Sequence, residues 1–249
     1  MTNNKQSKTT FGFKDVDKDE KIGLVKNVFE SVAIKYDIMN DLMSAGIHRL
    51  WKNKFINMID PNNDMTMLDV AGGTGDIAFR FLENGGGRVV VCDLTEGMVR
   101  VGKNRALDKG LFSNIDWLVG NAQKLPLQDN SVDVYSISFG LRNVADIDEA
   151  LAEAYRVLKP SGRFMCLEFS SVVIPVLDKI YDGYSFKVLP KIGKIVADDE
   201  ESYQYLVESI RRFPKQDELI KKMKKAGFEN TTYTNLTGGI SAIHSGYKI

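Results

Sequence analysis

Residues 68–76 read LDVAGGTGD, and this stretch decides the fold. It begins at the end of an apolar run and leads into closely spaced glycines. Gly73, Gly75 and Ala78 fit the spacing G-x-G-x-x-A of nucleotide-binding turns, in which glycine permits a tight turn and a close approach of the ligand to the backbone. Asp93 ends the next apolar run, where a carboxylate can accept hydrogen bonds from a ribose diol. Together these features predict a nucleotide-type ligand at the edge of a parallel sheet.

Apolar runs alternate with helix-like segments along the middle of the chain. Five short runs rich in Val, Ile, Leu and Phe are predicted strands: 65–71, 88–94, 114–121, 132–139 and 163–170. The helix-like segments between them are 76–84, 96–109 and 146–158. This alternation indicates βαβ units and a parallel sheet that is covered on both faces. Two more strand-like runs, separated by Gly238-Gly239, predict a C-terminal hairpin.

We expect one domain, preceded by a polar segment, residues 1–20, that the sequence predicts to be flexible. Apolar residues recur at helical spacing after this segment, which predicts helices that could lid a pocket. The predicted parts of the domain are a helical lid at 21–60, a ligand-binding core at 65–170, a helical segment facing substrate or membrane at 171–226, and the C-terminal strands at 228–249.

The composition excludes several classes of protein. The 249 residues carry 33 basic and 33 acidic side chains, whereas a generic nucleic-acid binder shows a basic excess, so no nucleic-acid partner is expected. Cys92 and Cys166 lie within apolar runs, and the two histidines form no cluster with them, so we expect no metal site. The polar start shows no signal-like apolar stretch, and no apolar run approaches the roughly 20 residues of a membrane span. We therefore expect a cytoplasmic protein.

The charges around the glycine turn indicate which nucleotide-type ligand fits. In an NAD site the pyrophosphate rests at the N-terminus of the first helix. Asp76 takes that position here and Asp69 precedes the turn, and two carboxylates repel a diphosphate where the dielectric is low. S-adenosylmethionine (SAM) has an adenosine, no phosphate, and two positive charges. Asn121 and Ala122 follow the third run, where an amide can bond the adenine edge and a small side chain can flank its ring. The sequence favours SAM and keeps NAD as the alternative.

A second polar stretch, SFGLRN (138–143), follows the fourth predicted strand. In open α/β sheets, ligands bind beyond the carboxyl ends of the strands. An arginine at a strand end is often only solvated, but Arg142 and Asn143 lie where the ligand cleft is expected. We therefore predict that they face into the ligand cleft.

The segments AGGTGD, GNAQKLP, SFGLRNV and YRVLKPSGR occur in the order and at the spacing of class I SAM-dependent methyltransferases. Three longer segments resemble the ubiquinone/menaquinone biosynthesis C-methyltransferase family: FESVAIKYDIMNDLMSAGIHRLWK (29–52), YDGYSFKVLPKIG (181–193) and YQYLVESIRRFP (203–214). The resemblance extends from about Phe11 to Ile249. The departures are Ser161, where glycine is common, and the glycine run at 85–87, and neither touches a proposed site residue.

The resemblance implies a Rossmann-like α/β fold with a mostly parallel seven-stranded sheet, helices on both faces, an N-terminal helical lid and a C-terminal antiparallel hairpin. It implies methyl transfer from SAM to a ring carbon of a polyprenylated quinol, either 2-methoxy-6-polyprenyl-1,4-benzoquinol or demethylmenaquinol. Carried over by motif, the implied cofactor contacts are Gly73, Thr74 and Gly75 in the turn, Asp93 at the ribose, Asn121 and Ala122 near the adenine, and Ser138 near the methyl donor.

Such a reaction needs a group that makes the quinol ring nucleophilic at carbon. The ring becomes nucleophilic as a hydroxyl loses its proton, and phenols titrate near pH ~10. Arg142 keeps its proton, so we expect it to stabilise the phenolate and to orient a water that takes the proton. Asn143 and Tyr36 are candidate substrate contacts, and His48 is a candidate proton acceptor. A turn-forming amide, a packed tyrosine and a structural histidine are the open alternatives.

The segment 174–196 combines apolar residues with four lysines and two aspartates. It predicts either a helix packed over the pocket or an interfacial contact with membrane lipid, as a greasy substrate requires. A homodimer and an assembly with other quinone-pathway enzymes are further partners that the sequence leaves open. An NAD-linked oxidoreductase and a non-catalytic scaffold are the competing functions, although a scaffold would be expected to lose SFGLRN or the glycine-turn acid.

Overall fold

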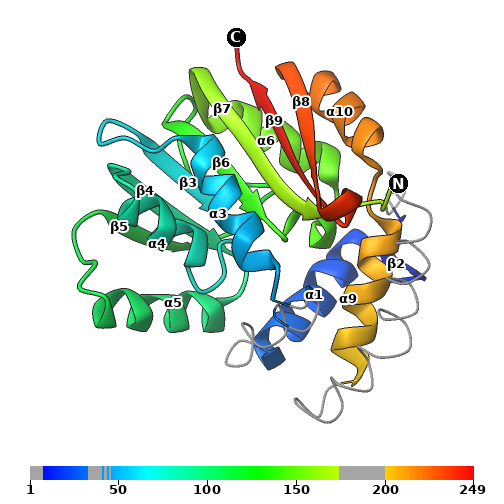
Figure 1. The fold of residues 1–249 in the computed structure, drawn as a ribbon. Helices are drawn as coiled ribbons and strands as arrows, with labels where there is room; N and C mark the ends of the chain where they lie inside the picture. Colours follow the sequence, from blue (N-terminus) through cyan, green and yellow to red (C-terminus); the bar gives the residue numbers. More distant parts are fainter. Residues whose placement is uncertain (1–7, 33–40, 42–43, 45, 174–199) are drawn as a thin grey trace, which may run out of the picture.

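A seven-stranded sheet forms the centre of the computed structural model, which describes residues 8–32, 41, 44, 46–173 and 200–249 (Figure 1). The strand order is β5-β4-β3-β6-β7-β9-β8, with parallel pairing from β5 to β7 and antiparallel pairing of β9 with both neighbours. The strands are β3 (Thr66–Val70), β4 (Arg88–Asp93), β5 (Ile115–Val119), β6 (Val132–Ser138), β7 (Leu158–Phe169), β8 (Glu229–Leu236) and β9 (Ser241–Tyr247). The predicted mostly parallel sheet with a C-terminal hairpin is confirmed.

Helices cover both faces of the sheet (Figure 1). One face packs against α3 (His48–Ile59), α4 (Asp76–Glu83) and α5 (Glu96–Asp108), and the other against α6 (Ile147–Val157) and α10 (Gln216–Lys225). Helices α1 (Lys18–Val32) and α9 (Glu200–Arg212) lie beyond the carboxyl ends of the strands (Figure 1). Met67 and Leu68 are neighbours on β3, are both fully buried, and belong to opposite core clusters. The strands are therefore apolar on both faces, as their lack of alternation indicates.

The N-terminal segment corrects a prediction. Residues 1–20 were expected to be flexible, but β1 (Lys8–Phe11) and β2 (Lys14–Asp17) pair as an antiparallel hairpin, and α1 follows directly. The hydroxyl of Thr9 donates to the carbonyl of Ala145 (2.9 Å), and the ring of Phe11 stacks on Tyr205 at 4.0 Å between centroids. These contacts with distant residues order a segment that looks unstructured by composition.

The junction between α6 and β7 differs from the predicted boundaries. The sequence predicts a helix to residue 158 and a strand from 163, whereas β7 already begins at Leu158. Ser161 takes a φ of +67°, and its N–H donates to the carbonyl of Lys248 (2.7 Å). Pairing with the C-terminal end of the chain therefore draws the expected loop into the strand, across a register shift opposite Val132–Val134.

Two of the predictions fall outside the described residues: the segment 174–196 and Tyr36. The described part of the predicted helical segment 171–226 contains α9 and α10, and a short 3-10 turn, η3 (Thr237–Gly239), joins the last two strands. Within the described part of the chain, no helix is long and apolar enough to cross a membrane.

Candidate active site

The glycine turn after β3 packs tightly against the sheet. Gly73 and Gly75 have φ values of +56° and +88°, in the left-handed region that favours glycine. A Cβ at Gly75 would lie 2.7 Å from the ring of Trp117, and one at Gly72 would lie 2.6 Å from Val91. Both the backbone conformation and the lack of space therefore explain why this turn is built from glycine.

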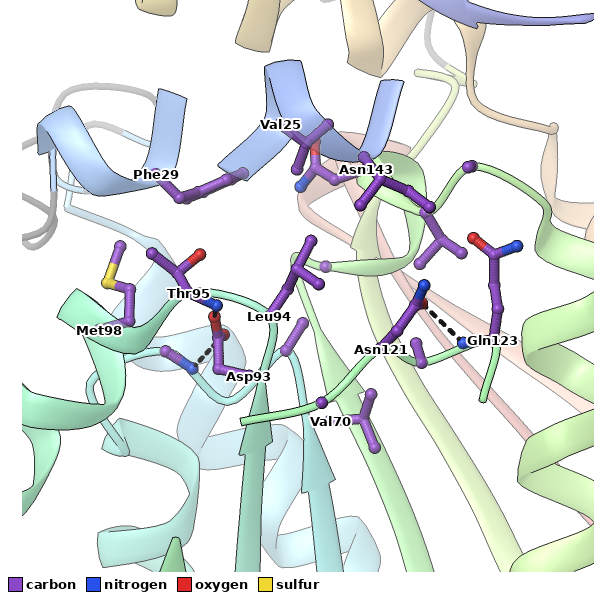
Figure 2. Close-up of a pocket in the computed structure, with 18 of the residues that line it drawn as sticks. Val25, Phe29, Val70, Asp93, Leu94, Thr95, Met98, Asn121, Gln123 and Asn143 are labelled. Carbon is purple, nitrogen blue, oxygen red and sulfur yellow. Dashed lines mark hydrogen bonds between the residues drawn. The ribbon is translucent and has the colours of Figure 1, made fainter. Parts of the chain in front are cut away.

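Asp93, at the end of β4, holds the glycine turn from the other side. Its Oδ2 accepts from the N–H of Gly73 (2.9 Å), and its Oδ1 accepts from the N–H of Thr95 (2.8 Å), as the dashed lines in Figure 2 show. Burial raises the pKa of Asp93, and these backbone hydrogen bonds oppose the rise. Each carboxylate oxygen keeps further acceptor capacity, and the side chain lines the mostly apolar main pocket described below.

Asn121 and Ala122 form the opposite wall of this pocket, after β5. The Asn121 Oδ1 accepts from the N–H of Gln123 (2.9 Å), which fixes the amide and leaves its NH₂ group available to a ligand (Figure 2). The structure therefore brings Gly73, Asp93, Asn121 and Ala122 together, as the sequence predicts for an adenosine-binding cleft.

Helix α1 forms the roof of this main pocket. Val25 and Phe29 point from α1 toward the carboxyl ends of the strands, above Asp93 and Leu94 (Figure 2). The pocket and its mouth enclose about 680 Å³, and aliphatic or aromatic side chains make up most of the lining. A mostly apolar pocket with a few fixed polar groups is the usual form of a small-molecule site.

A smaller pocket adjoins the main one at the residues that follow β3 and β6. Ala71 and Phe139 line both pockets, and both have left-handed φ values, +50° and +55°. Such values in non-glycine residues store backbone strain, which concentrates at functional sites. The remaining lining includes two predicted residues, Thr74 and Ser138, together with Lys52, Asp69, Gly72, Asp76 and Ile77.

Asp69 is a fully buried carboxyl group that lines the smaller pocket. Its Oδ1 accepts from the Ser136 hydroxyl (2.6 Å), while its Oδ2 has no partner among the described residues. The Ser138 hydroxyl, which lines the same pocket, is likewise buried without a described partner. Burial, with the nearby charges of Asp76 and Asp93, raises the pKa of Asp69 to about 7. The pocket therefore offers two unsatisfied polar atoms to a ligand.

Asp76 is neutralised within the protein. Its carboxylate pairs with Lys52 (2.8 Å) and with Arg80 (2.9 Å). Burial raises its pKa, but the two cations outweigh burial and leave the pKa below its usual value. The carboxylate is therefore charged near neutral pH, and Lys52 and Arg80 compensate its charge.

Arg142 lies in η2 (Leu141–Asn143), and its guanidinium is in the protein interior. Its Nη1 donates to Glu168 (2.6 Å) and to the carbonyl of Phe139 (2.7 Å), and the group lies 5.4 Å from the ring centroid of Phe169. The side chains of the ion pair are 2% and 1% exposed. We expected Arg142 to face the acceptor of the reaction. The structure instead places it behind the Phe139 turn, outside the lining of the main and smaller pockets.

Asn143 does line the main pocket. Its Oδ1 accepts a hydrogen bond from the Tyr205 hydroxyl of α9 (3.0 Å), and its NH₂ group points toward the Phe139 carbonyl at 3.5 Å. The amide is therefore part of a buried network that joins α9 to the turn after β6.

His48 lies apart from these residues. Its Nδ1 contacts the Ser44 hydroxyl (2.9 Å), and it lines a separate pocket with Asp76 and Arg105. Burial lowers the pKa of His48 to about 4, so the ring is neutral near pH 7. The structure does not bring His48 into one pocket with Asn143. No cluster of three metal-ligating side chains occurs among the described residues.

Glu168 and Tyr205 are the site residues that sequence reasoning missed. Glu168 is the single acid in the apolar run RFMCLEF, and an acid in a buried strand requires a partner. The sequence therefore indicates that Glu168 has a buried partner, but it does not identify that partner as Arg142. Tyr205 sits among other aromatic residues of an amphipathic helix, and nothing in its spacing distinguishes it.

The model of the ubiE/COQ5 methyltransferase family matches residues 14–248. The chain belongs to this family. It is 56% identical over 244 residues to the ubiquinone/menaquinone biosynthesis C-methyltransferase of Brucella abortus, covering 96% of this chain and 91% of the relative. This confirms the family assigned from the sequence, and the protein is a methyltransferase.

Two solved structures show the same fold at low identity. A SAM-dependent methyltransferase from Thermotoga maritima is 22% identical with a TM-score of 0.64, over 90% of this chain and all of that one. A phosphoethanolamine N-methyltransferase from Haemonchus contortus, solved in complex with S-adenosyl-L-methionine, is 16% identical with a TM-score of 0.60, over 80% of this chain and 52% of that one. These similarities confirm the class I SAM-methyltransferase fold.

Proposed function

We propose that this protein transfers a methyl group from SAM to a ring carbon of a polyprenylated quinol in the synthesis of ubiquinone, menaquinone or both. The observation that carries the proposal is the 56% identity to a quinone-pathway C-methyltransferase over 96% of the chain. The two pockets support the proposal, because the polar residues at the carboxyl ends of β3, β4, β5 and β6 match the adenosine and amino-acid halves of SAM in turn.

The main pocket fits the adenosine half of SAM. Asp93 presents two carboxylate oxygens that can accept from the ribose hydroxyls, and the amide of Asn121 can bond the adenine edge. Ala122 and the apolar roof of α1 leave a flat, mostly apolar space for the base. These contacts recognise a nucleoside without requiring a phosphate.

The smaller pocket fits the amino-acid half of SAM. The free Oδ2 of Asp69 and the hydroxyl of Ser138 are buried acceptors that a ligand ammonium would satisfy, and Lys52 is a cation beside them. When bound, SAM supplies a methyl group already activated by its sulfonium. Asp69, buried beside the glycine turn, disfavours the diphosphate of NAD when it is ionised, so this residue fits the oxidoreductase alternative poorly, whereas Lys52 and Arg80 compensate the charge of Asp76.

We propose that the turn after β6 directs the acceptor. Arg142 and Glu168 fix the Phe139 carbonyl, and Tyr205 fixes the amide of Asn143 at the pocket wall. The guanidinium is paired with Glu168, so the ion pair acts on a phenolate as an oriented dipole behind this wall rather than as a free positive charge. Tyr36 stays a candidate substrate contact. His48, neutral and in another pocket, is the weaker candidate for proton acceptance.

The test is methyl transfer itself, measured with SAM carrying a trideuterated methyl group. Short-tailed demethylmenaquinol and methoxy-benzoquinol analogues are supplied separately, and mass spectrometry locates the label. We expect it on a ring carbon of at least one quinol. Asp93→Asn should raise KM for SAM strongly, whereas Asp116→Asn, which breaks an exposed pair with Arg88, should not. Label on oxygen, or on neither quinol, contradicts the proposal. Stabilisation by NADH and not by S-adenosylhomocysteine would support the oxidoreductase.

We further propose a cytoplasmic enzyme that meets its lipid substrate at the membrane face. The greasy tail of the acceptor requires such contact or a partner that carries the lipid. The segment 174–196, which carries this prediction, lies outside the described residues. Flotation with anionic liposomes tests it, and salt-independent absence of binding contradicts it. Crosslinking and mass measurement in solution test the homodimer and the quinone-pathway assembly.

A further inference from the structure

A third pocket lies behind the turn that holds Arg142, and it is distinct from the two pockets assigned to SAM. The N-terminal hairpin, α1, α9 and the residues after η2 enclose it, and the two helices lie side by side near the hairpin (Figure 1). The pocket and its mouth enclose about 740 Å³. It shares only Val144 and Ala145 with the lining of the main pocket.

This pocket is strongly basic. Six basic side chains and a single carboxylate, that of Asp146, are among the described residues that line it: Lys8, Lys18, Lys21, Arg142, Arg212 and Lys222. The carboxylate is already occupied, because it accepts from two N–H groups at the start of α6 and pairs with Lys18 (2.6 Å). It therefore compensates none of the other cations.

Three of the six cations have their charge compensated by an ion pair. Lys18 pairs with Asp146, Arg142 pairs with Glu168 (2.6 Å), and Lys222 pairs with Asp148 (2.6 Å). The other three, Lys8, Lys21 and Arg212, have no carboxylate partner in the part of the chain that the structure describes. The guanidinium of Arg212 lies only over the ring of Phe13, at 5.6 Å.

Lys21 is the most unusual of these cations. Its residue is 6% exposed, and its ammonium donates one hydrogen bond, to the carbonyl of Val144 (2.8 Å). Burial lowers its pKa to about 8. Lysine is almost never buried this deeply without a partner, because an isolated buried charge is costly. A bound anion would satisfy its remaining donors and offset that cost.

We propose that this basic pocket binds a phosphate group, either as a free phosphate compound or as a phospholipid headgroup. Three uncompensated cations from β1, α1 and α9 match the multiple negative charge of a phosphate, and ammonium and guanidinium groups both bind phosphate oxygens well. The polar walls exclude the quinol ring as the occupant. The proposal is independent of the methyl acceptor, because the pocket is separate from both SAM pockets.

Isothermal titration with inorganic phosphate at constant ionic strength tests the site. We expect saturable binding to the full-length protein and binding weakened at least ~10-fold in Lys21→Met, which keeps the aliphatic stem and removes the charge. Phosphate should raise the melting temperature of the wild type and leave that of Lys21→Met unchanged. Lys221→Gln removes an exposed cation of α10 that does not line the pocket, and it should bind like the wild type.

If Lys21→Met does not fold, the double variant Lys8→Gln/Arg212→Gln replaces it in these experiments, because both side chains are exposed. It should also lose phosphate binding. Vesicles of phosphatidylcholine with and without phosphatidic acid distinguish the sources. Binding that needs phosphatidic acid and is lost in the pocket variants identifies a headgroup, whereas binding of inorganic phosphate without vesicle binding identifies a free phosphate compound. Failure of the wild type to bind either probe, or equal binding by wild type and pocket variants, overturns the proposal.

Discussion

The hydroxyl of Tyr205 donates a 3.0 Å hydrogen bond to Oδ1 of Asn143, and this bond joins α9 to the wall of the main pocket. Both side chains are buried, at 4% and 8% exposure. The ring of Tyr205 is held in turn by Phe11 of the N-terminal hairpin. Three segments far apart in the sequence thereby fix one amide at the wall of the main pocket.

Tyr205→Phe should therefore affect both stability and cofactor binding. Removing the hydroxyl leaves the Asn143 oxygen without its partner, at a cost of about 1–2 kcal/mol, or a melting temperature lower by roughly 2–8 °C. The freed amide should also raise KM for SAM several-fold with a smaller effect on kcat. Tyr233→Phe, on the exposed face of β8, is the matched control. Unchanged KM in Tyr205→Phe would show that the bond is only structural.

Arg142→Lys should separate charge from geometry at the neighbouring residue. Lysine keeps the positive charge but lacks the planar guanidinium, whose Nη1 donates to both Glu168 and the Phe139 carbonyl and which lies over the Phe169 ring. We expect SAM affinity within about two-fold of the wild type and kcat lower by about 10²-fold, the scale of a lost electrostatic contact. Titration calorimetry and single-turnover rates measure the two effects. Arg88→Lys, which alters an exposed ion pair on β4, is the control for replacing an arginine by a lysine. Normal turnover in Arg142→Lys would show that Arg142 has no role in the reaction.

Glu168→Gln should act mainly on stability. Burial raises the pKa of Glu168, and Arg142 opposes the rise, so the pair holds a charge that neither side chain could bear alone in the interior. Neutralising the acid leaves the guanidinium buried and unpaired, which costs about 3–5 kcal/mol. Urea unfolding should show this loss, and the double variant Glu168→Gln/Arg142→Met should recover part of it. A loss below ~1 kcal/mol in Glu168→Gln would mean that water or a rearranged side chain reaches Arg142.

The sequence predicts the parts of the site that depend on local pattern. Asp93 and the glycine turn are recognisable because a strand end and a turn place them by short-range rules. The position of Asn121 is predictable for the same reason, because it follows the next strand of the sheet, β5. Arg142 was placed correctly along the chain, at the end of β6, but its direction was not predictable. Its partner Glu168 lies on the neighbouring strand, and only the parallel register of β6 and β7 brings them together.

Contacts between distant segments account for what the sequence could not predict. The hairpin at 8–17 is polar, and its order depends on Thr9 and Phe11 reaching residues more than 130 positions away. The basic pocket behind the Phe139 turn has the same origin, since its three uncompensated cations come from the hairpin, α1 and α9. The composition of a single segment cannot predict which distant residues it will contact.

The affinity of the protein for SAM should depend on pH through Asp69. With its pKa raised to about 7, this carboxyl is largely protonated at pH 6, and a protonated acid cannot pair with the ammonium of the ligand. SAM binding should therefore tighten by up to ~10-fold between pH 6 and pH 8 and release close to one proton near pH 6. Asp69→Asn should bind weakly and without this pH dependence. Calorimetry in buffers of different ionisation enthalpy measures both quantities.

The same pKa has a consequence for the unliganded protein, with the opposite sign. Between the ordinary pKa of 3.8 and about 7, the native Asp69 keeps a proton that the unfolded chain releases. The contribution of Asp69 to the free energy of unfolding therefore falls as the pH rises through this window. The difference in unfolding free energy between Asp69→Asn and the wild type should shift in favour of the variant from pH 4 to pH 7. If SAM affinity is flat from pH 6 to 8 and this difference is also flat, Asp69 is ionised throughout and its burial is compensated by a group not yet identified.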